Sequence, residues 1–248
     1  MFRNIVKQVS FAPGTLTGST SFTAAAQLSS ASPAHFSSDP FSAANLARTL
    51  KELNDESTRK IFGSFEADGT ARQSSVLIPL CQHKGEPTIL FNLRSNRLTR
   101  HKGYPCFPGG VAEESDLDSV HTALRETHEE LGLAPQSIKV IGTFPRFKMP
   151  RDNMEITAVI ADIGDIDSHT LNINYDEVSL VFSRTIKELT STENTGPYKI
   201  WGVTAMLLHI LLGRLVPDLY IRPLRPIVFH KTYEPIDISH FKAKNNSP

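Results

Sequence analysis

Residues 109–133 read Gly109-Gly-Val-Ala-Glu-Glu-Ser-Asp-Leu-Asp-Ser-Val-His-Thr-Ala-Leu-Arg-Glu-Thr-His-Glu-Glu-Leu-Gly-Leu133, and this stretch decides the fold. Apolar side chains recur at helical spacing between residues 119 and 131, and Gly132 then interrupts the pattern. The spacing predicts a helix over residues 119–131 that packs its apolar face against a sheet. The Gly109-Gly110 pair predicts a sharp turn before it.

The predicted helix carries three glutamates, Glu126, Glu129 and Glu130, which are one helical turn or one residue apart. Their carboxylates therefore share one face. Like charges at this spacing destabilise a helix by roughly 0.2–0.5 kcal/mol per pair, and Arg125 neutralises only one of them. Glu-rich faces are often simply solvated. With the glycine turn before the helix and Gly132 after it, we instead expect a bound divalent cation, because Mg²⁺ and Mn²⁺ prefer oxygen ligands.

Regular elements are predicted on both sides of this stretch. Short apolar runs with β-branched residues predict strands, and apolar residues three and four apart predict helices. The strands are expected at 75–80, 88–93, 104–107, 138–143, 155–163 and 177–182, and the further helices at 41–60, 185–189 and 200–215. Strands interleaved with helices indicate an α/β protein with one core. The apolar run at 200–212 is too short to span a membrane.

Composition narrows the possible partners. Lys plus Arg and Asp plus Glu number 26 each, so no overall charge attracts nucleic acid. Two cysteines, Cys81 and Cys106, form neither a disulfide framework nor a zinc pattern. Residues 1–38 contain no acidic residue and are rich in serine and threonine. This composition is typical of a mitochondrial transit peptide, the alternative being a disordered tail on a cytoplasmic protein.

The central stretch resembles the signature of the Nudix hydrolases, in which Gly, Glu and Arg-Glu-x-x-Glu-Glu-x-Gly recur at fixed spacing. Gly110 matches the opening glycine, and Arg125 to Leu133 match the distal half. Asp116 stands where the family has its first Glu, but eight rather than seven residues separate it from Arg125, and Thr127 replaces an aliphatic residue. The intact distal half favours retained activity, whereas the equivalence of Asp116 is in doubt.

The residues upstream narrow the resemblance to one branch. Leu93-Arg-Ser-Asn-Arg-Leu-Thr-Arg-His-Lys-Gly-Tyr-Pro-Cys-Phe-Pro-Gly-Gly110 is similar to the coenzyme A diphosphatases, and most to the mitochondrial ones of animals. The stretch places Arg94, Arg97, Arg100 and Lys102 within nine residues. Coenzyme A carries a diphosphate and a 3′-phosphate, and arginine suits bidentate phosphate contacts. We expect the substrate contacts to come from Arg94, Ser95, Gly103, Gly109 and Gly110.

The resemblance implies a Nudix-type α/β/α sandwich with a mixed sheet in a single domain. We expect a leader over 1–40, a helical lead-in over 41–70, the Nudix domain over 71–225 and a C-terminal extension over 226–248. The implied reaction is metal-dependent hydrolysis of coenzyme A or acyl-coenzyme A to 4′-phosphopantetheine, or its acyl form, and 3′,5′-ADP.

The resemblance also implies roles for the residues of the predicted helix. Glu126 and Glu130 are the first candidates for ligands of Mg²⁺ or Mn²⁺. Glu129 is a ligand or the base that activates water, and Arg125 orients the set. Glu177 is a weaker candidate for a further carboxylate. The rival hypotheses are a diphosphatase for another nucleotide, such as ADP-ribose or a dinucleotide, and a catalytically silent nucleotide-binding module. The pattern is compatible with a monomer and with a homodimer.

Overall fold

A computed structural model describes residues 39–62, 69–149, 153–191 and 198–220, which all belong to one compact unit. The strands are β1 (Arg72–His83), β2 (Glu86–Arg94), β3 (Pro105–Cys106), β4 (Gly109–Val111), β5 (Lys139–Thr143), β6 (Phe147–Met149), β7 (Met154–Asp165) and β8 (Val178–Thr185). The α-helices are α2 (Ala43–Leu53), α3 (Glu56–Phe62), α4 (Ser119–Leu131), α5 (Ile186–Thr190) and α6 (Gly202–Leu215), with 3₁₀ turns at Pro135–Ser137 and Ile166–Ser168.

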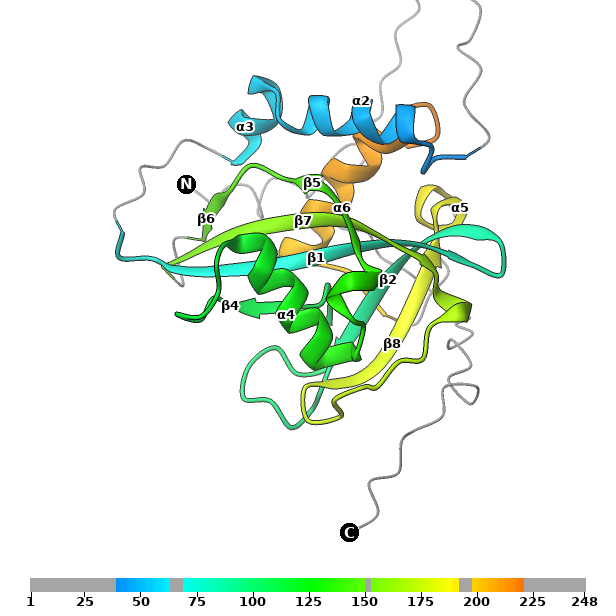
Figure 1. Ribbon diagram of the computed structural model, residues 1–248. Helices are drawn as coiled ribbons and strands as arrows, with labels where there is room; N and C mark the ends of the chain where they lie inside the picture. The colour runs from blue at the N-terminus through cyan, green and yellow to red at the C-terminus, as the bar shows by residue number, and fades with distance from the viewer. Residues whose placement is uncertain (1–38, 63–68, 150–152, 192–197, 221–248) are drawn as a thin grey trace, which may run out of the picture. The chain divides into compact units, whose positions relative to one another are not determined.

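The strands form one mixed sheet (Figure 1). β1 is parallel to β7 and antiparallel to β2 and β4, so its two halves have different neighbours. β2 also pairs with β3 and β8, and β7 pairs with β5 and β6. Because β4 takes the place of β2 beside the first half of β1, Gly109 and Gly110 of β4 lie against the middle of the sheet.

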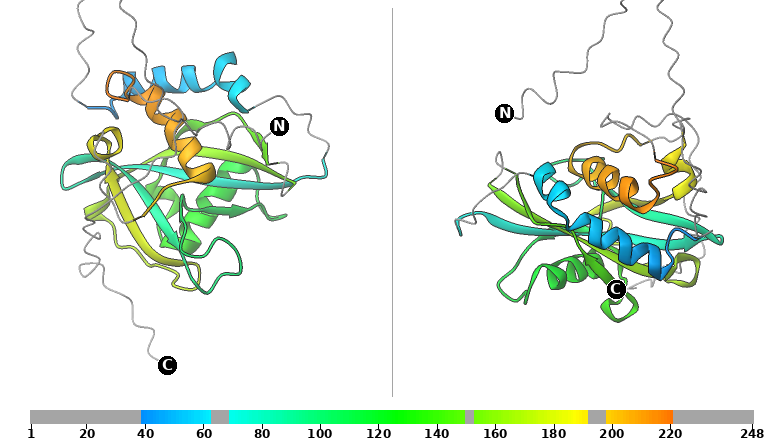
Figure 2. Two further views of the ribbon diagram at one scale, coloured as in Figure 1. Left: turned by 180° about the vertical axis from the view of Figure 1, so that it is seen from behind. Right: turned by 90° about the horizontal axis from the view of Figure 1, so that it is seen from above.

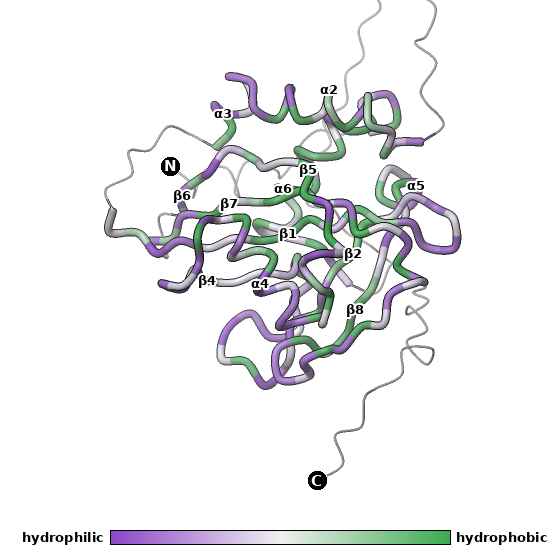
Figure 3. Tube along the Cα trace, in the orientation of Figure 1, coloured by the Kyte–Doolittle hydropathy of each residue, from purple (hydrophilic) through white to green (hydrophobic). Residues whose placement is uncertain are grey.

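Helices cover both faces of the sheet (Figure 2), with α4 on one face and α2 and α6 on the other. Successive residues of a strand point to opposite faces. Leu77 and Leu90 accordingly belong to the core under α4, whereas Ile78 and Phe91 belong to the core under α6. Figure 3 shows the resulting apolar character of α6 along most of its length. The predicted α/β/α arrangement in a single domain is confirmed.

The predicted helix over 119–131 is confirmed at both ends. The Asp118 side chain accepts a hydrogen bond from the His121 N–H, at 2.8 Å, and so caps the first turn of α4. Gly132 follows Leu131 in the left-handed conformation and ends the helix. These two caps set the ends of α4, and its buried residues Ala123 and Leu131 face the sheet.

Two predictions about elements need correction. The single helix expected over 41–60 is two helices, α2 and α3, because the Asp55 carboxylate accepts a hydrogen bond from the Thr58 N–H at 2.7 Å and starts a new helix. The strand expected at 75–80 is longer, and the short strands β4 and β6 were not predicted at all. Three residues are too few to show a periodic pattern.

The predicted leader lies almost entirely, and the predicted C-terminal extension entirely, outside the described residues. In the part of the chain that the structure describes, none of the helices combines the length and the apolar character needed to cross a bilayer.

Candidate functional site

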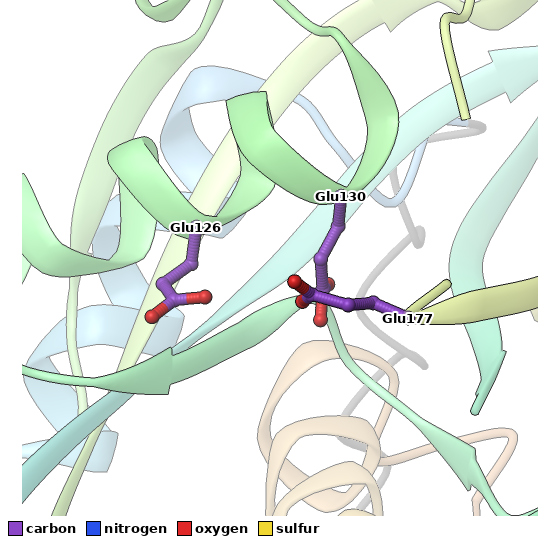
Figure 4. Close-up of side chains that lie close together, drawn as sticks. All are labelled: Glu126, Glu130 and Glu177. Atoms are coloured by element: carbon purple, nitrogen blue, oxygen red, sulfur yellow. The ribbon is translucent and has the colours of Figure 1, made fainter. Parts of the chain in front are cut away.

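Three carboxylates meet where α4 passes over the sheet (Figure 4). Glu126 and Glu130 lie one turn apart on α4, and Glu177 immediately precedes β8. One oxygen of each carboxylate lies within 4.8 Å of the others. Figure 4 shows both helical side chains pointing down from α4, with the Glu177 carboxylate beside that of Glu130. We call Glu126, Glu130 and Glu177 the carboxylate cluster.

Glu130 is the buried member of the cluster, with 2% of its surface exposed. The Asn92 side chain donates a hydrogen bond to it from Nδ2 at 2.8 Å, and the Gly109 N–H donates another at 3.2 Å. Burial nevertheless raises the pKa of Glu130 to about 8, and burial also raises the pKa of Glu126. Carboxylates that are costly to ionise without compensation fit a divalent cation, which oxygen ligands of this kind bind.

The sharp turn predicted at Gly109-Gly110 is instead the beginning of strand β4, where the two glycines let the backbone approach the cluster closely. Gly109 has a φ of 149°, and a Cβ there would overlap the Ser75 carbonyl oxygen. A Cβ on Gly110 would overlap the carboxylate of Glu126. Side chains at either position would therefore displace the backbone or the cluster, which explains why β4 begins with two glycines.

Arg125 connects the outer side of α4 to the segment that precedes the helix. Its Nε and Nη2 donate hydrogen bonds to both oxygens of Asp116, each at 2.9 Å, and Nη2 also donates to the Val111 carbonyl at 3.0 Å. Its Nη1 lies 2.9 Å from Glu129 and 3.2 Å from Glu126. Arg125 therefore contacts both Glu126 and Glu129 through one nitrogen atom.

Asp116 is the main partner of Arg125, although its place in the family pattern was in doubt. Its side chain is 2% exposed. The hydrogen bonds from Arg125 hold its pKa well below the usual range, so it stays ionised. Asp116 therefore anchors the Arg125 side chain.

Glu129, a predicted ligand or base, lies outside the carboxylate cluster. Its side chain is 48% exposed, and Arg125 binds its Oε2. Neighbours three residues apart on α4 thus have different surroundings: Glu126 faces the sheet, and Glu129 faces outward beside it.

Arg94, at the end of β2, lies beside the cluster. Its positive charge acts on Glu130, and its side chain contacts the Cys106 thiol. Its Nε is buried and has no hydrogen-bond partner among the described residues. An unpaired buried donor costs roughly 1–3 kcal/mol, which an anionic ligand could recover. Burial raises the pKa of Cys106 to about 12, so this thiol is not a nucleophile at neutral pH.

Ser95 and Gly103, two predicted substrate contacts, have protein partners. The Ser95 N–H donates to the Glu177 carbonyl at 2.8 Å, and its hydroxyl donates to the Tyr175 carbonyl at 3.1 Å. The Gly103 N–H donates to the Arg94 carbonyl at 3.0 Å. Ser95 therefore fixes the backbone that carries Glu177. Gly103 closes the loop over residues 95–104 between β2 and β3, which carries Arg97, Arg100 and Lys102 and which we call the basic loop.

Two hollows of the described surface lie away from the carboxylate cluster. One of about 120 Å³ lies at the N-terminal end of α4, next to Asp118, and one of about 1150 Å³ extends from there towards α3. The cluster comes from the C-terminal half of α4. We place the site at the cluster, because the charged groups converge there.

Glu177 and Asn92 are the members of the site that the sequence indicates least. Glu177 was the first residue of the strand predicted at 177–182 and only a weaker candidate for a further carboxylate. Asn92 had a stronger signal, since it is a polar residue within the apolar run Thr88-Ile-Leu-Phe-Asn-Leu93. A buried polar residue in such a strand needs a partner, and that partner is Glu130.

Known proteins with similar sequences point to one family. The NUDIX domain model matches residues 71–197. The mitochondrial coenzyme A diphosphatase NUDT8 of Homo sapiens is 37% identical over 185 residues, covering 65% of this chain and 78% of that protein. NUDT8 of Mus musculus is 37% identical over 168 residues, covering 59% and 80%. A solved Nudix hydrolase from M. smegmatis, RenU, has a TM-score of 0.46 at 18% identity, covering 62% of this chain and 90% of that one. The chain belongs to the Nudix hydrolase family.

Proposed function

We propose that this chain hydrolyses the diphosphate of coenzyme A or acyl-coenzyme A. Water adds to one phosphorus and the bridging P–O bond breaks, which yields 4′-phosphopantetheine, or its acyl form, and 3′,5′-ADP. The observation that carries the proposal is the carboxylate cluster with the unpaired Nε of Arg94 beside it. The identity to two proteins named mitochondrial coenzyme A diphosphatases supports the choice of substrate.

Glu126, Glu130 and Glu177 would hold Mg²⁺ or Mn²⁺. Such a cation supplies Lewis acidity to the diphosphate oxygens. Glu130 contributes a carboxylate fixed by Asn92 and Gly109, and Glu126 one fixed by Arg125. Glu177 takes the place in the ligand set that the sequence suggested for Glu129.

Glu129 is our candidate for the residue that accepts the proton of the attacking water. Its carboxylate shares Nη1 of Arg125 with Glu126, so it stands next to the cluster without belonging to it. Its exposure allows it to pass the proton on to solvent. Arg125 would act on Glu126 and Glu129 only by holding their carboxylates in place, because its hydrogen bonds and ion pairs are with protein groups.

Arg94 would bind a phosphate oxygen of the substrate. Its guanidinium lies beside Glu130 and has an unused donor in the interior. Arg100 and Lys102, further along the same loop, are exposed and form no ion pair within the described part of the chain. They are available for the 3′-phosphate of coenzyme A. Arg97 differs, because it pairs with Asp176.

A mitochondrial location is part of the proposal. Both relatives are named mitochondrial proteins, and residues 1–38 have the acid-free, serine-rich composition of a transit peptide.

Hydrolysis by the purified full-length chain tests the proposal. Coenzyme A, acetyl-coenzyme A, dephospho-coenzyme A, ADP-ribose and NADH are supplied in parallel with Mg²⁺ or Mn²⁺, and with EDTA as control. We expect metal-dependent release of 3′,5′-ADP from coenzyme A or its acyl form, faster than cleavage of the others. Preference for ADP-ribose or a dinucleotide would overturn the proposed substrate and leave the proposed diphosphate hydrolysis in place. Binding of coenzyme A without turnover of any compound would make the chain a silent module.

A further inference from the structure

Two exposed aromatic side chains lie in contact next to the basic loop. Three of the Phe, Tyr and Trp side chains that the structure describes are exposed: Tyr104, Tyr175 and Trp201. Tyr104 and Trp201, 39% and 41% exposed, meet edge to face with ring centroids 4.4 Å apart. The His101 ring lies 5.8 Å from that of Tyr104. We call His101, Tyr104 and Trp201 the aromatic ledge.

Local stability does not account for Trp201 at this position. Trp201 is the residue that precedes the first turn of α6, and its side chain makes no capping hydrogen bond. Serine, threonine, aspartate or asparagine at such a position stabilises a helix by ~1 kcal/mol relative to a residue that cannot cap. The chain therefore forgoes a cap and exposes its one tryptophan. A departure from the local rule at an exposed aromatic residue is expected where the side chain serves binding.

The ledge adjoins the carboxylate cluster through the end of β2. The Arg94 N–H donates to the Tyr104 carbonyl at 3.1 Å, so Tyr104 lies directly across from Arg94. Arg94 follows Asn92 by two residues on β2, and Asn92 donates a hydrogen bond to Glu130. Tyr104 immediately precedes β3 and is two residues from Cys106, or roughly 7 Å in an extended chain. A nucleotide with its diphosphate at the cluster therefore has its sugar and base within reach of the ledge.

The positive charges next to the aromatic ledge indicate which half of the substrate binds there. His101 is flanked by Arg100 and Lys102, both exposed and without ion pairs within the described residues. Cations beside exposed rings match a planar base next to a phosphorylated ribose. The pantetheine half offers neither a ring nor a second phosphate. We propose that the aromatic ledge stacks the adenine base of the substrate while Arg100 and Lys102 bind its 3′-phosphate, an inference that rests on the proposed function.

The single tryptophan makes the proposal directly measurable. Emission of Trp201 in the full-length protein is recorded while 3′,5′-ADP, 5′-AMP or 4′-phosphopantetheine is added. Adenine stacked on the indole should quench the emission, with 3′,5′-ADP acting at lower concentration than 5′-AMP and 4′-phosphopantetheine leaving it unchanged. Quenching by 4′-phosphopantetheine alone, or by none of the three in a preparation that hydrolyses coenzyme A, would overturn the proposal. Quenching by the adenine nucleotides in a preparation that leaves coenzyme A intact would support the ledge and reject the proposed substrate.

Kinetics of variants provide a second readout. Trp201→Ala should raise KM for coenzyme A at least about fivefold with little change in kcat, since base stacking on an aromatic residue has about this effect. Trp201→Phe should recover most of the loss, because it restores a ring. Leu219→Ala removes an apolar side chain that is 56% exposed, beyond the other end of α6, and serves as the control. Equal KM values for Trp201→Ala and Leu219→Ala would contradict stacking.

Discussion

Arg125 binds Asp116, nine residues earlier in the chain, through two hydrogen bonds of 2.9 Å from Nε and Nη2. The pair ties the loop before α4 to the helix and leaves Nη1 for Glu126 and Glu129. The acidic residue that departs from the family spacing therefore acts on the site by fixing the arginine.

Asp116→Asn should lower kcat by about tenfold or more, because groups that orient metal ligands typically contribute 10–100-fold. The variant keeps the shape of the side chain and loses its charge, so the fold should remain intact by circular dichroism. Glu114→Gln, an exposed acid in the same loop, is the matched control and should leave kcat unchanged. Equal activity of the two variants would remove Asp116 from this role.

The variants Glu177→Gln and Glu129→Gln should distinguish a ligand of the metal ion from the base that accepts the proton of water. Loss of Glu177 removes a member of the carboxylate cluster, so both turnover and the rise in Tm on adding Mn²⁺ should fall. Loss of Glu129 should reduce turnover by roughly 10²–10⁴-fold, the usual contribution of a general base, and leave the Mn²⁺-dependent rise in Tm intact. If Glu129→Gln abolishes the rise and Glu177→Gln preserves it, the assignments must be exchanged.

The metal-free protein should lose stability as pH rises from about 4.5 to about 8. The pKa of Glu130 is raised from an ordinary 4.5 to about 8 in the fold, so the folded state holds this proton more tightly than the unfolded state does. The contribution of Glu130 is therefore fully present below about pH 4.5 and is lost as pH passes the folded value. The loss should be on the order of a few kcal/mol.

Urea unfolding in EDTA at several pH values measures this loss. Glu130→Gln is neutral at every pH and can still accept the hydrogen bonds from Asn92 and Gly109, so its stability should vary less over the same range. A wild-type protein without the decline, or a variant with the same decline, would show that burial does not set the pKa of Glu130.

Arg94→Ala should raise KM for coenzyme A by about tenfold or more, because a charge-assisted contact to phosphate contributes roughly 1.5–3 kcal/mol. Arg94→Lys keeps the charge and loses the planar fork, so it should recover only part of the loss. Comparing coenzyme A with dephospho-coenzyme A locates the contact. A larger increase for coenzyme A assigns Arg94 to the 3′-phosphate, and equal increases assign it to the diphosphate. Unchanged KM values for both substrates would exclude Arg94 from binding.

A helix or strand could be predicted from the sequence where its apolar pattern extends over many residues and capping residues mark its ends. The helix from Ser119 to Leu131 has both an apolar face and caps, and its bounds agree with the prediction. β4 is too short to show a pattern, yet its pairing with β1 brings Gly109 and Gly110 to the site. Pairing between segments far apart in sequence is a tertiary event that local patterns do not encode.

The carboxylate cluster was predictable only in part. Glu126 and Glu130 follow from helical spacing, because residues four apart share a face. Glu129 lies at similar spacing, but the sheet contacts a narrow strip of α4 and leaves Glu129 on its edge. Glu177 comes from a loop that the hydrogen bonds of Ser95 hold in place, a contact between residues more than eighty positions apart.

The most direct test of the account measures the release of 3′,5′-ADP from coenzyme A by the wild-type chain and by Glu130→Gln, side by side, with Mg²⁺ and with EDTA. We predict turnover by the wild type that requires Mg²⁺ and a loss of more than about 100-fold in the variant. Thermal unfolding should confirm that the variant remains folded. Full Mg²⁺-dependent turnover by Glu130→Gln would contradict the assignment of the carboxylate cluster as the metal site.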